Sequence, residues 1–100
     1  LYFLSERVNA EEALRLGLAN CAVEAQDLAS KTRAIAARPA AGPAVCLRYM
    51  KENLKRAMGG EVDDCLDLEA THHVHSAATA DHREAAKAFV EKREPTFEGR

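Results

Sequence analysis

A mainly α-helical fold is predicted by three features of this sequence. Apolar residues recur three and four positions apart in four segments, which gives expected helices near residues 27–37, 43–58, 61–78 and 81–93. Gly17, Gly59 and Gly60 stand at the ends of expected helices, and a proline follows the expected helices 27–37 and 81–93. Residues 21–23 are the one stretch that fits a short strand or extended segment, and one strand cannot make a sheet alone.

Residues 1–25 contain one short helix ahead of these four segments. Asn9 is a suitable N-cap, and Glu12 three residues later can complete a capping box with it. Gly17 is expected to stop the helix after about two turns, because glycine adopts the left-handed conformation that commonly follows a helix. The short strand or extended segment at residues 21–23 comes next.

The three middle helices are marked by their end residues. Asp27 can cap the first, and Pro39 ends it because proline cannot continue a helix. Pro43 suits the first position of the second helix, which stops at Gly59 and Gly60. The third starts with acidic residues that favour the positive end of the helix dipole, namely Glu61, Asp63 and Asp64.

The last helix has a well-defined start and an unusually large apolar face. Asp81 is expected as its N-cap, and Glu84 three residues later as the second member of a capping box. Pro95 follows the end of the helix. The apolar face consists of Ala85, Ala86, Phe89 and Val90. We expect this face to dock onto another part of a protein, because it is too large for a free-standing helix.

Composition predicts a chain that relies on further protein surface. Twenty of the 47 apolar residues are Ala, so few large side chains remain to build a core, and an oligomer or a longer parent protein is expected. The formal charge of −2 gives no reason to expect binding to nucleic acid or to a membrane. No apolar run approaches the length of a membrane span. Three separated cysteines fit reduced core thiols in a cytoplasmic protein.

A histidine cluster is the most prominent group of potential metal ligands. It contains His72, His73 and His75, with His82 further along. A metal site needs three or four converging ligands, and the sequence lacks an HExxH pattern or a nearby cysteine pair, so structural histidines are expected and metal binding is the alternative. The cysteines and the adjacent carboxylates are interpreted as structural. The residues alone contain no complete catalytic group.

Two motifs, in their order along the chain, resemble the enoyl-CoA hydratase/isomerase (crotonase) family. The first is SERVNAEEALRLGLAN, which carries the family pattern at Ala10, Glu12, Ala13, Gly17 and Leu18. The second is TADHREAAKAFVEKREPTF, which resembles the terminal helix of the family with its Phe-Val-Glu-Lys-Arg run. A segment of three helices separates them, as in the family, and the resemblance covers essentially all 100 residues.

The resemblance implies a C-terminal portion of such a protein. Residues 1–25 would be the end of the ββα spiral core, and residues 26–100 the C-terminal helical region that assembles trimers or hexamers. The catalytic carboxylates and the oxyanion hole would precede Leu1, so no catalytic residue is expected here. The substrate would be an acyl-CoA thioester, with no cofactor and no metal. Phe89 and Lys92 would contact the CoA nucleotide, commonly at the site of a neighbouring subunit.

Two kinds of function are therefore open. The first is part of an enoyl-CoA hydratase/isomerase-type enzyme that supplies subunit contacts and part of the CoA site. The second is a stand-alone helical assembly module without catalytic activity. The type of reaction within the family and the preferred acyl chain depend on residues outside this sequence.

Overall fold

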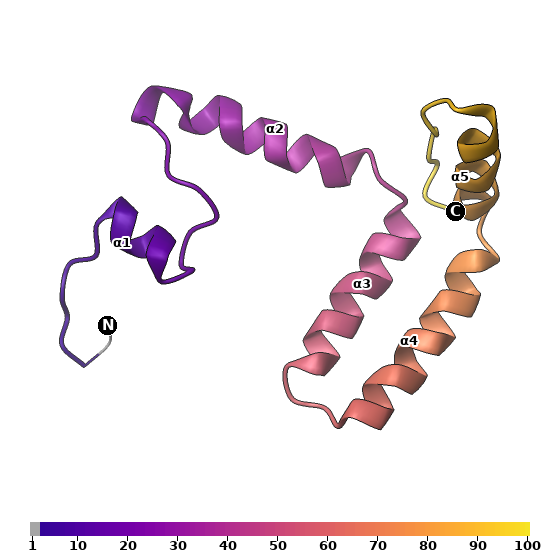
Figure 1. Ribbon diagram of the computed structural model, residues 1–100, viewed down its shortest axis with the longest axis horizontal. Coiled ribbons are helices and arrows are strands. Elements are labelled where there is room, and N and C mark those ends of the chain that lie inside the picture. Colours follow the sequence, from indigo (N-terminus) through magenta and orange to yellow (C-terminus); the bar gives the residue numbers. More distant parts are fainter. Residues whose placement is uncertain (1–2) are drawn as a thin grey trace. The chain divides into compact units, whose positions relative to one another are not determined.

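The computed structural model describes residues 3–100, and its helices confirm the prediction of a mainly α-helical chain (Figure 1). The structure divides into an N-terminal unit, Leu1–Ala34, and a C-terminal unit, Ile35–Arg100. The expected division near residue 25 into a core remnant and a helical region stays a prediction. Residues 1 and 2 of the expected first segment lie outside the described range.

Helix α1, Ala10–Arg15, begins and ends where the sequence predicts. The Asn9 side chain accepts a hydrogen bond of 2.9 Å from the Glu12 backbone N–H, which satisfies one free donor of the first turn. Gly17 follows the helix with a φ of 71°. The backbone N–H of Leu18 donates to the Ala13 carbonyl, so the helix closes as a Schellman motif.

The capping box of α1 is only half formed. The Glu12 carboxylate does not turn back to the N-cap; instead it accepts hydrogen bonds of 2.7 and 2.6 Å from the Arg15 guanidinium one turn later. An ion pair at this spacing is common on a helix surface. Asn9 therefore caps α1 without the reciprocal bond that the sequence pattern suggested.

Residues 21–23 form neither a strand nor a helix, so the short strand, one of the two forms expected here, is absent. Across residues 3–100 no strand offers these residues a hydrogen-bonding neighbour, which a β-ladder requires. A 3₁₀ turn, η1, spans Ala25–Asp27 and leads directly into helix α2, Leu28–Ala40. Helix α2 runs past its expected end at residue 37 and includes Pro39 in its last turn.

Helices α3, Ala44–Ala57, and α4, Val62–Ala77, lie side by side as an antiparallel pair (Figure 1). The turn between them contains Gly59 and Gly60, as predicted. Arg56 of α3 pairs with Asp64 of α4 at 2.9 Å across this turn. Further along the pair, the Tyr49 ring stacks on the His72 ring with centroids 4.2 Å apart.

Helix α5, Ala80–Glu91, starts at a different cap from the one predicted. Thr79 is the N-cap, and its hydroxyl accepts a hydrogen bond of 3.1 Å from the His82 N–H while donating to the Ser76 carbonyl at 2.7 Å. Asp81 lies inside the first turn and is buried, with 2% of its surface exposed. Its carboxylate is occupied by the C-terminal tail, defined here as residues 94–100, so the predicted capping box with Glu84 is wrong.

Little of the apolar surface is buried within the described chain. Ala88 is the one buried apolar residue among residues 3–100, and His72 and Asp81 are the buried polar ones. On α5, the residues Asp81 and Ala88 face inward while Phe89 and Val90 remain 85% and 79% exposed. The chain therefore leaves the large side chains of the predicted apolar face uncovered.

Two further sequence predictions can be compared with the fold. Cys21 is exposed, which corrects its expected place in a core, while Cys46 and Cys65 are partly covered; all three thiols are free. Among the described residues, no helix combines the length and the apolar character needed to cross a membrane.

Candidate ligand-binding site

Phe89 and Lys92 are both accessible at the C-terminal end of α5. Phe89 belongs to the last turn of the helix and exposes 85% of its surface. Lys92 is the residue that ends the helix, and it is also exposed. The aromatic ring and the ammonium group that sequence reasoning selected are thus available to a ligand at one helix end.

Lys92 has a left-handed backbone conformation. Its φ and ψ are 53° and 42°, values that are uncommon for a residue with a side chain. The backbone N–H of Lys92 donates to the Phe89 carbonyl at 3.3 Å, and that of Arg93 donates to the Ala88 carbonyl at 3.0 Å. This is the hydrogen-bond pattern of a Schellman motif, with lysine where glycine is usual.

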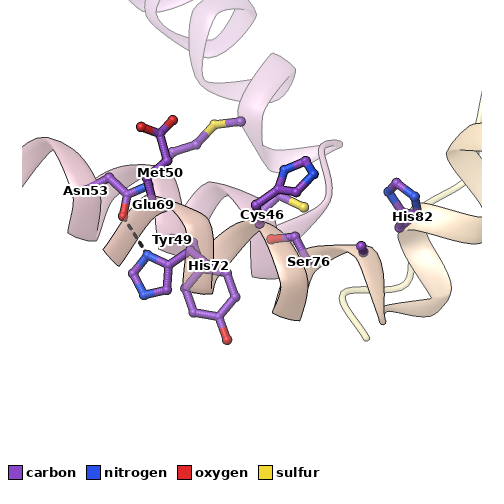
Figure 2. A pocket seen from close by; sticks show the side chains of 10 residues that line it. Cys46, Tyr49, Met50, Asn53, Glu69, His72, Ser76 and His82 are labelled. Atoms are coloured by element: carbon purple, nitrogen blue, oxygen red, sulfur yellow. Dashed lines mark hydrogen bonds between the residues drawn. The ribbon is translucent and has the colours of Figure 1, made fainter. Parts of the chain in front are cut away.

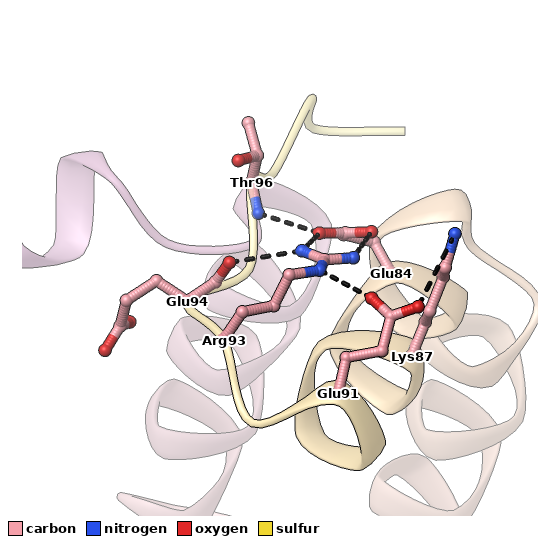
Figure 3. Close-up of polar contacts among 6 residues, drawn as sticks. All are labelled: Glu84, Lys87, Glu91, Arg93, Glu94 and Thr96. Atoms are coloured by element: carbon pink, nitrogen blue, oxygen red, sulfur yellow. Dashed lines mark hydrogen bonds and ion pairs between the residues drawn. The ribbon is translucent and has the colours of Figure 1, made fainter.

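Arg93 holds the chain on both sides of Lys92 (Figure 3). Its guanidinium makes a bidentate contact with the Glu84 carboxylate, with N–O distances of 2.5 and 3.0 Å. The Nε of Arg93 donates to Glu91 at 2.7 Å, and one terminal nitrogen donates to the Glu94 carbonyl at 3.1 Å. A planar guanidinium suits such multiple acceptors because its donors are fixed in one plane.

The Glu84 carboxylate is strongly favoured in its ionised form. Hydrogen bonding from the Arg93 guanidinium, supported by the Thr96 backbone N–H at 3.1 Å, lowers the pKa of Glu84 from 4.5 to about 2. The same contact raises the pKa of Arg93 above its ordinary value. The pair is fully charged near neutral pH, and we call Glu84, Glu91, Arg93 and Thr96 the Arg93 clamp.

Asp81 fixes the far end of the tail. Its two carboxylate oxygens accept hydrogen bonds of 2.7 Å from the Glu98 N–H and 2.9 Å from the Gly99 N–H. The Asp81 N–H donates in turn to the Arg100 carbonyl at 3.1 Å. The tail therefore folds back along α5 and is held at Glu84 and again at Asp81.

An open cavity of about 240 Å³ lies between α3, α4 and the start of α5 (Figure 2). The Nδ1 of His72 lies 2.5 Å from the Asn53 side-chain oxygen, and its Nε2 lies 3.4 Å from Glu52. His73 and His82 also line this cavity. Among residues 3–100 no three His, Cys, Asp or Glu side chains are grouped so that they could hold a metal ion.

Sequence reasoning did not find the Arg93 clamp or the role of Asp81. The sequence places Arg93 at the end of the Phe-Val-Glu-Lys-Arg run without a predicted partner, and it predicts Asp81 and Glu84 as a capping box. Two signals in the sequence were available. Asp81 and Glu84 are spaced three residues apart on one side of α5, ahead of a short tail. The tail contains Gly99, whose φ of 78° permits a tight turn.

Comparison with known proteins identifies a family that matches the whole chain. The family profile described as enoyl-CoA hydratase/isomerase matches residues 1–100. The chain is 32% identical to the short-chain-enoyl-CoA hydratase of Clostridium acetobutylicum, over 93% of this chain and 36% of that protein. It is 31% identical to the 1,2-epoxyphenylacetyl-CoA isomerase of Escherichia coli K12, over 100% of this chain and 38% of that protein.

Solved structures agree with these matches. An enoyl-CoA hydratase subunit from Geobacillus kaustophilus matches with a TM-score of 0.90 and 32% identity, over 98% of this chain and 38% of that one. An enoyl-CoA hydratase from Bacillus anthracis matches with a TM-score of 0.89 and 28% identity, over 95% of this chain and 37% of that one. The chain thus spans little more than a third of the length of the proteins it matches.

Proposed function

We infer the function from the family to which this chain belongs, the enoyl-CoA hydratase/isomerase family, and propose that it is the C-terminal part of an enzyme acting on acyl-CoA thioesters. The match of the family profile over residues 1–100 is the observation that carries this proposal. Relatives named as hydratases and as an isomerase are similarly close, so the proposal is limited to acyl-CoA chemistry.

Within such an enzyme, the end of α5 would bind the nucleotide part of CoA. The exposed Phe89 ring offers a face on which adenine can stack, and the Lys92 ammonium offers a charge for a phosphate. Their closeness in sequence and their shared accessibility support this role. The chemical step would belong to the remainder of the protein, where an oxyanion hole would stabilise the enolate of the thioester.

The exposed apolar side chains would supply contacts between subunits or with the remainder of the protein. Met58, Phe89 and Val90 are each more than three-quarters exposed, and few large side chains are covered within the described chain. Burial of such surface is the main driving force of association. We propose a trimer or hexamer as the resulting assembly, in the cytoplasm.

The nucleotide contact is tested with Lys92→Ala in the whole protein. Loss of the ammonium group should raise KM for acyl-CoA with little change in kcat, because the lost contact is equally strong in the ground state and the transition state. Lys31→Ala is the matched control, since Lys31 is an exposed lysine of α2 that has no part in the Arg93 clamp. An unchanged KM for Lys92→Ala would overturn the contact.

The alternative is a stand-alone assembly module without catalytic activity. The large uncovered apolar surface is compatible with this function as well. Intact-mass measurement of the native protein separates the two: a native species of 10.9 kDa supports the module, and one of the relatives' full length supports the enzyme.

A further inference from the structure

We propose that Glu84 and Arg93 are positioning residues for CoA binding, because their ion pair holds the left-handed turn that presents Lys92. The inference rests on the proposed contact between Lys92 and the CoA nucleotide, and it adds a second set of residues to that site. Neither Glu84 nor Arg93 needs to touch the ligand in this role.

The conformation of Lys92 requires support from its surroundings. The left-handed region is unfavourable for a residue with a Cβ atom, and such residues persist where neighbouring contacts fix them. Among the described residues that are not glycine, Lys92 shares a positive φ only with Ser5. In the right-handed conformation the helix would continue, and the Lys92 side chain would project in another direction.

The Arg93 clamp provides that support from both sides of the turn. Glu91 precedes Lys92 and Arg93 follows it, and the two side chains are joined at 2.7 Å. The bidentate contact with Glu84 ties the same guanidinium to the second turn of α5. Rotation of the backbone at Lys92 would therefore break contacts at three carboxylate oxygens.

The tail strengthens this arrangement. The Thr96 N–H donates to the Glu84 oxygen that also faces Arg93, and the Asp81 carboxylate holds the tail two residues further on. The Glu84 and Arg93 side chains are only 25% and 38% exposed, so their ion pair is screened less than a fully exposed one. The backbone at Lys92 is thus fixed in its left-handed conformation before a ligand binds, which lowers the conformational entropy that binding has to remove.

The test compares two substrates in the whole protein carrying Glu84→Gln. An acyl-CoA and the acyl-pantetheine with the same acyl group share the thioester, but only acyl-CoA has the nucleotide. Glu84→Gln should raise KM for acyl-CoA roughly three- to tenfold, which lies in the lower part of the range of coupling energies between residues in contact, and leave kcat unchanged. KM for acyl-pantetheine should stay as in the parent protein, which also verifies that the variant is folded.

Glu11→Gln, at an exposed glutamate of α1, is the matched control and should change neither KM. An equal rise of KM for both substrates would overturn the inference, because it would indicate general damage to the protein. An unchanged KM for acyl-CoA would overturn it as well.

Lys92→Ala, measured with the same two substrates, separates this inference from the proposed function. If Lys92→Ala leaves the ratio of the two KM values unchanged, the nucleotide contact fails and the positioning role fails with it. If Lys92→Ala changes the ratio and Glu84→Gln does not, only the positioning role is overturned. In the double variant, the Glu84→Gln effect should largely disappear, since the residue that is positioned is gone.

Discussion

The backbone N–H of Gly99 donates a hydrogen bond of 2.9 Å to the Asp81 carboxylate, which joins the end of the chain to the first turn of α5. Asp81 is 2% exposed and also accepts from the Glu98 N–H at 2.7 Å. A charged acceptor shared by two consecutive amides gives strong hydrogen bonds. The tail is therefore a fixed part of the C-terminal unit.

Asp81→Ala should release the end of the tail. The Glu98 and Gly99 amides lose their acceptor, at a cost of about 1–3 kcal/mol, so their protection against hydrogen exchange should fall. Asp63→Ala is the matched control. Asp63 is an exposed aspartate in the first turn of α4, so it interacts with the helix dipole as Asp81 does but does not hold the tail. Equal loss of protection in both variants would contradict the role of the Asp81 carboxylate.

The ion pair between Glu84 and Arg93 predicts a defined dependence of stability on pH. The pKa of Glu84 in the folded protein is about 2, below its ordinary 4.5, chiefly because of Arg93. Its ionised form therefore stabilises the fold above about pH 4.5, and this contribution is lost as the pH falls from there toward 2.

Glu84→Gln removes the titrating group and tests this dependence. The difference in unfolding free energy between the parent protein and the variant should shrink as the pH is lowered through that window. Urea unfolding at a series of pH values measures it. A difference that stays constant between pH 4.5 and 2 would show that the ion pair contributes nothing to the stability.

The contact between His72 and Asn53 should stabilise the α3–α4 pair. His72 is 8% exposed, and the Asn53 oxygen accepts from its Nδ1 at 2.5 Å. Asn53→Ala leaves that buried N–H without an acceptor and should cost about 1–3 kcal/mol in urea unfolding. Asn53→Asp keeps an acceptor at the same place and should cost less. The reverse order of the two variants would contradict the assignment.

The local sequence was sufficient to predict the elements whose signals lie within one turn. Asn9 and Gly17 bound α1 as expected because a cap and a left-handed stop act on neighbouring residues. Pro39 was expected to end α2 near residue 37, yet α2 continues to Ala40. Proline has no backbone N–H to donate, but Pro39 lies in the last turn, so the missing hydrogen bond affects only the end of the helix.

The contacts of the tail could not be predicted in the same way. Asp81 satisfies every local criterion for an N-cap, but Thr79 takes that role and Asp81 binds residues 17 and 18 positions away. The clamp likewise joins Arg93 to a carboxylate nine positions earlier. Such pairings depend on how the tail folds back, which the helical periodicity does not encode. Phe89 and Lys92 were selected through the family resemblance, and their role stays a prediction.

The two adjacent glycines between α3 and α4 should respond differently to the same substitution. A Cβ on Gly60 would lie 2.9 Å from the Arg56 carbonyl oxygen and 3.2 Å from the Cys65 sulfur, whereas one on Gly59 would meet nothing within 4 Å. Since the nearest atom belongs to the backbone, Gly60→Ala must shift the turn, and we expect it to cost about 1–3 kcal/mol. Gly59→Ala should stay within about 0.5 kcal/mol of the parent protein.

Thermal unfolding followed by far-UV circular dichroism measures both variants under identical conditions. Because Arg56 also pairs with Asp64 across this turn, hydrogen exchange at the end of α3 should rise in Gly60→Ala and not in Gly59→Ala. Equal stability of the two variants would mean that the turn yields to the added methyl group without loosening the contact between α3 and α4.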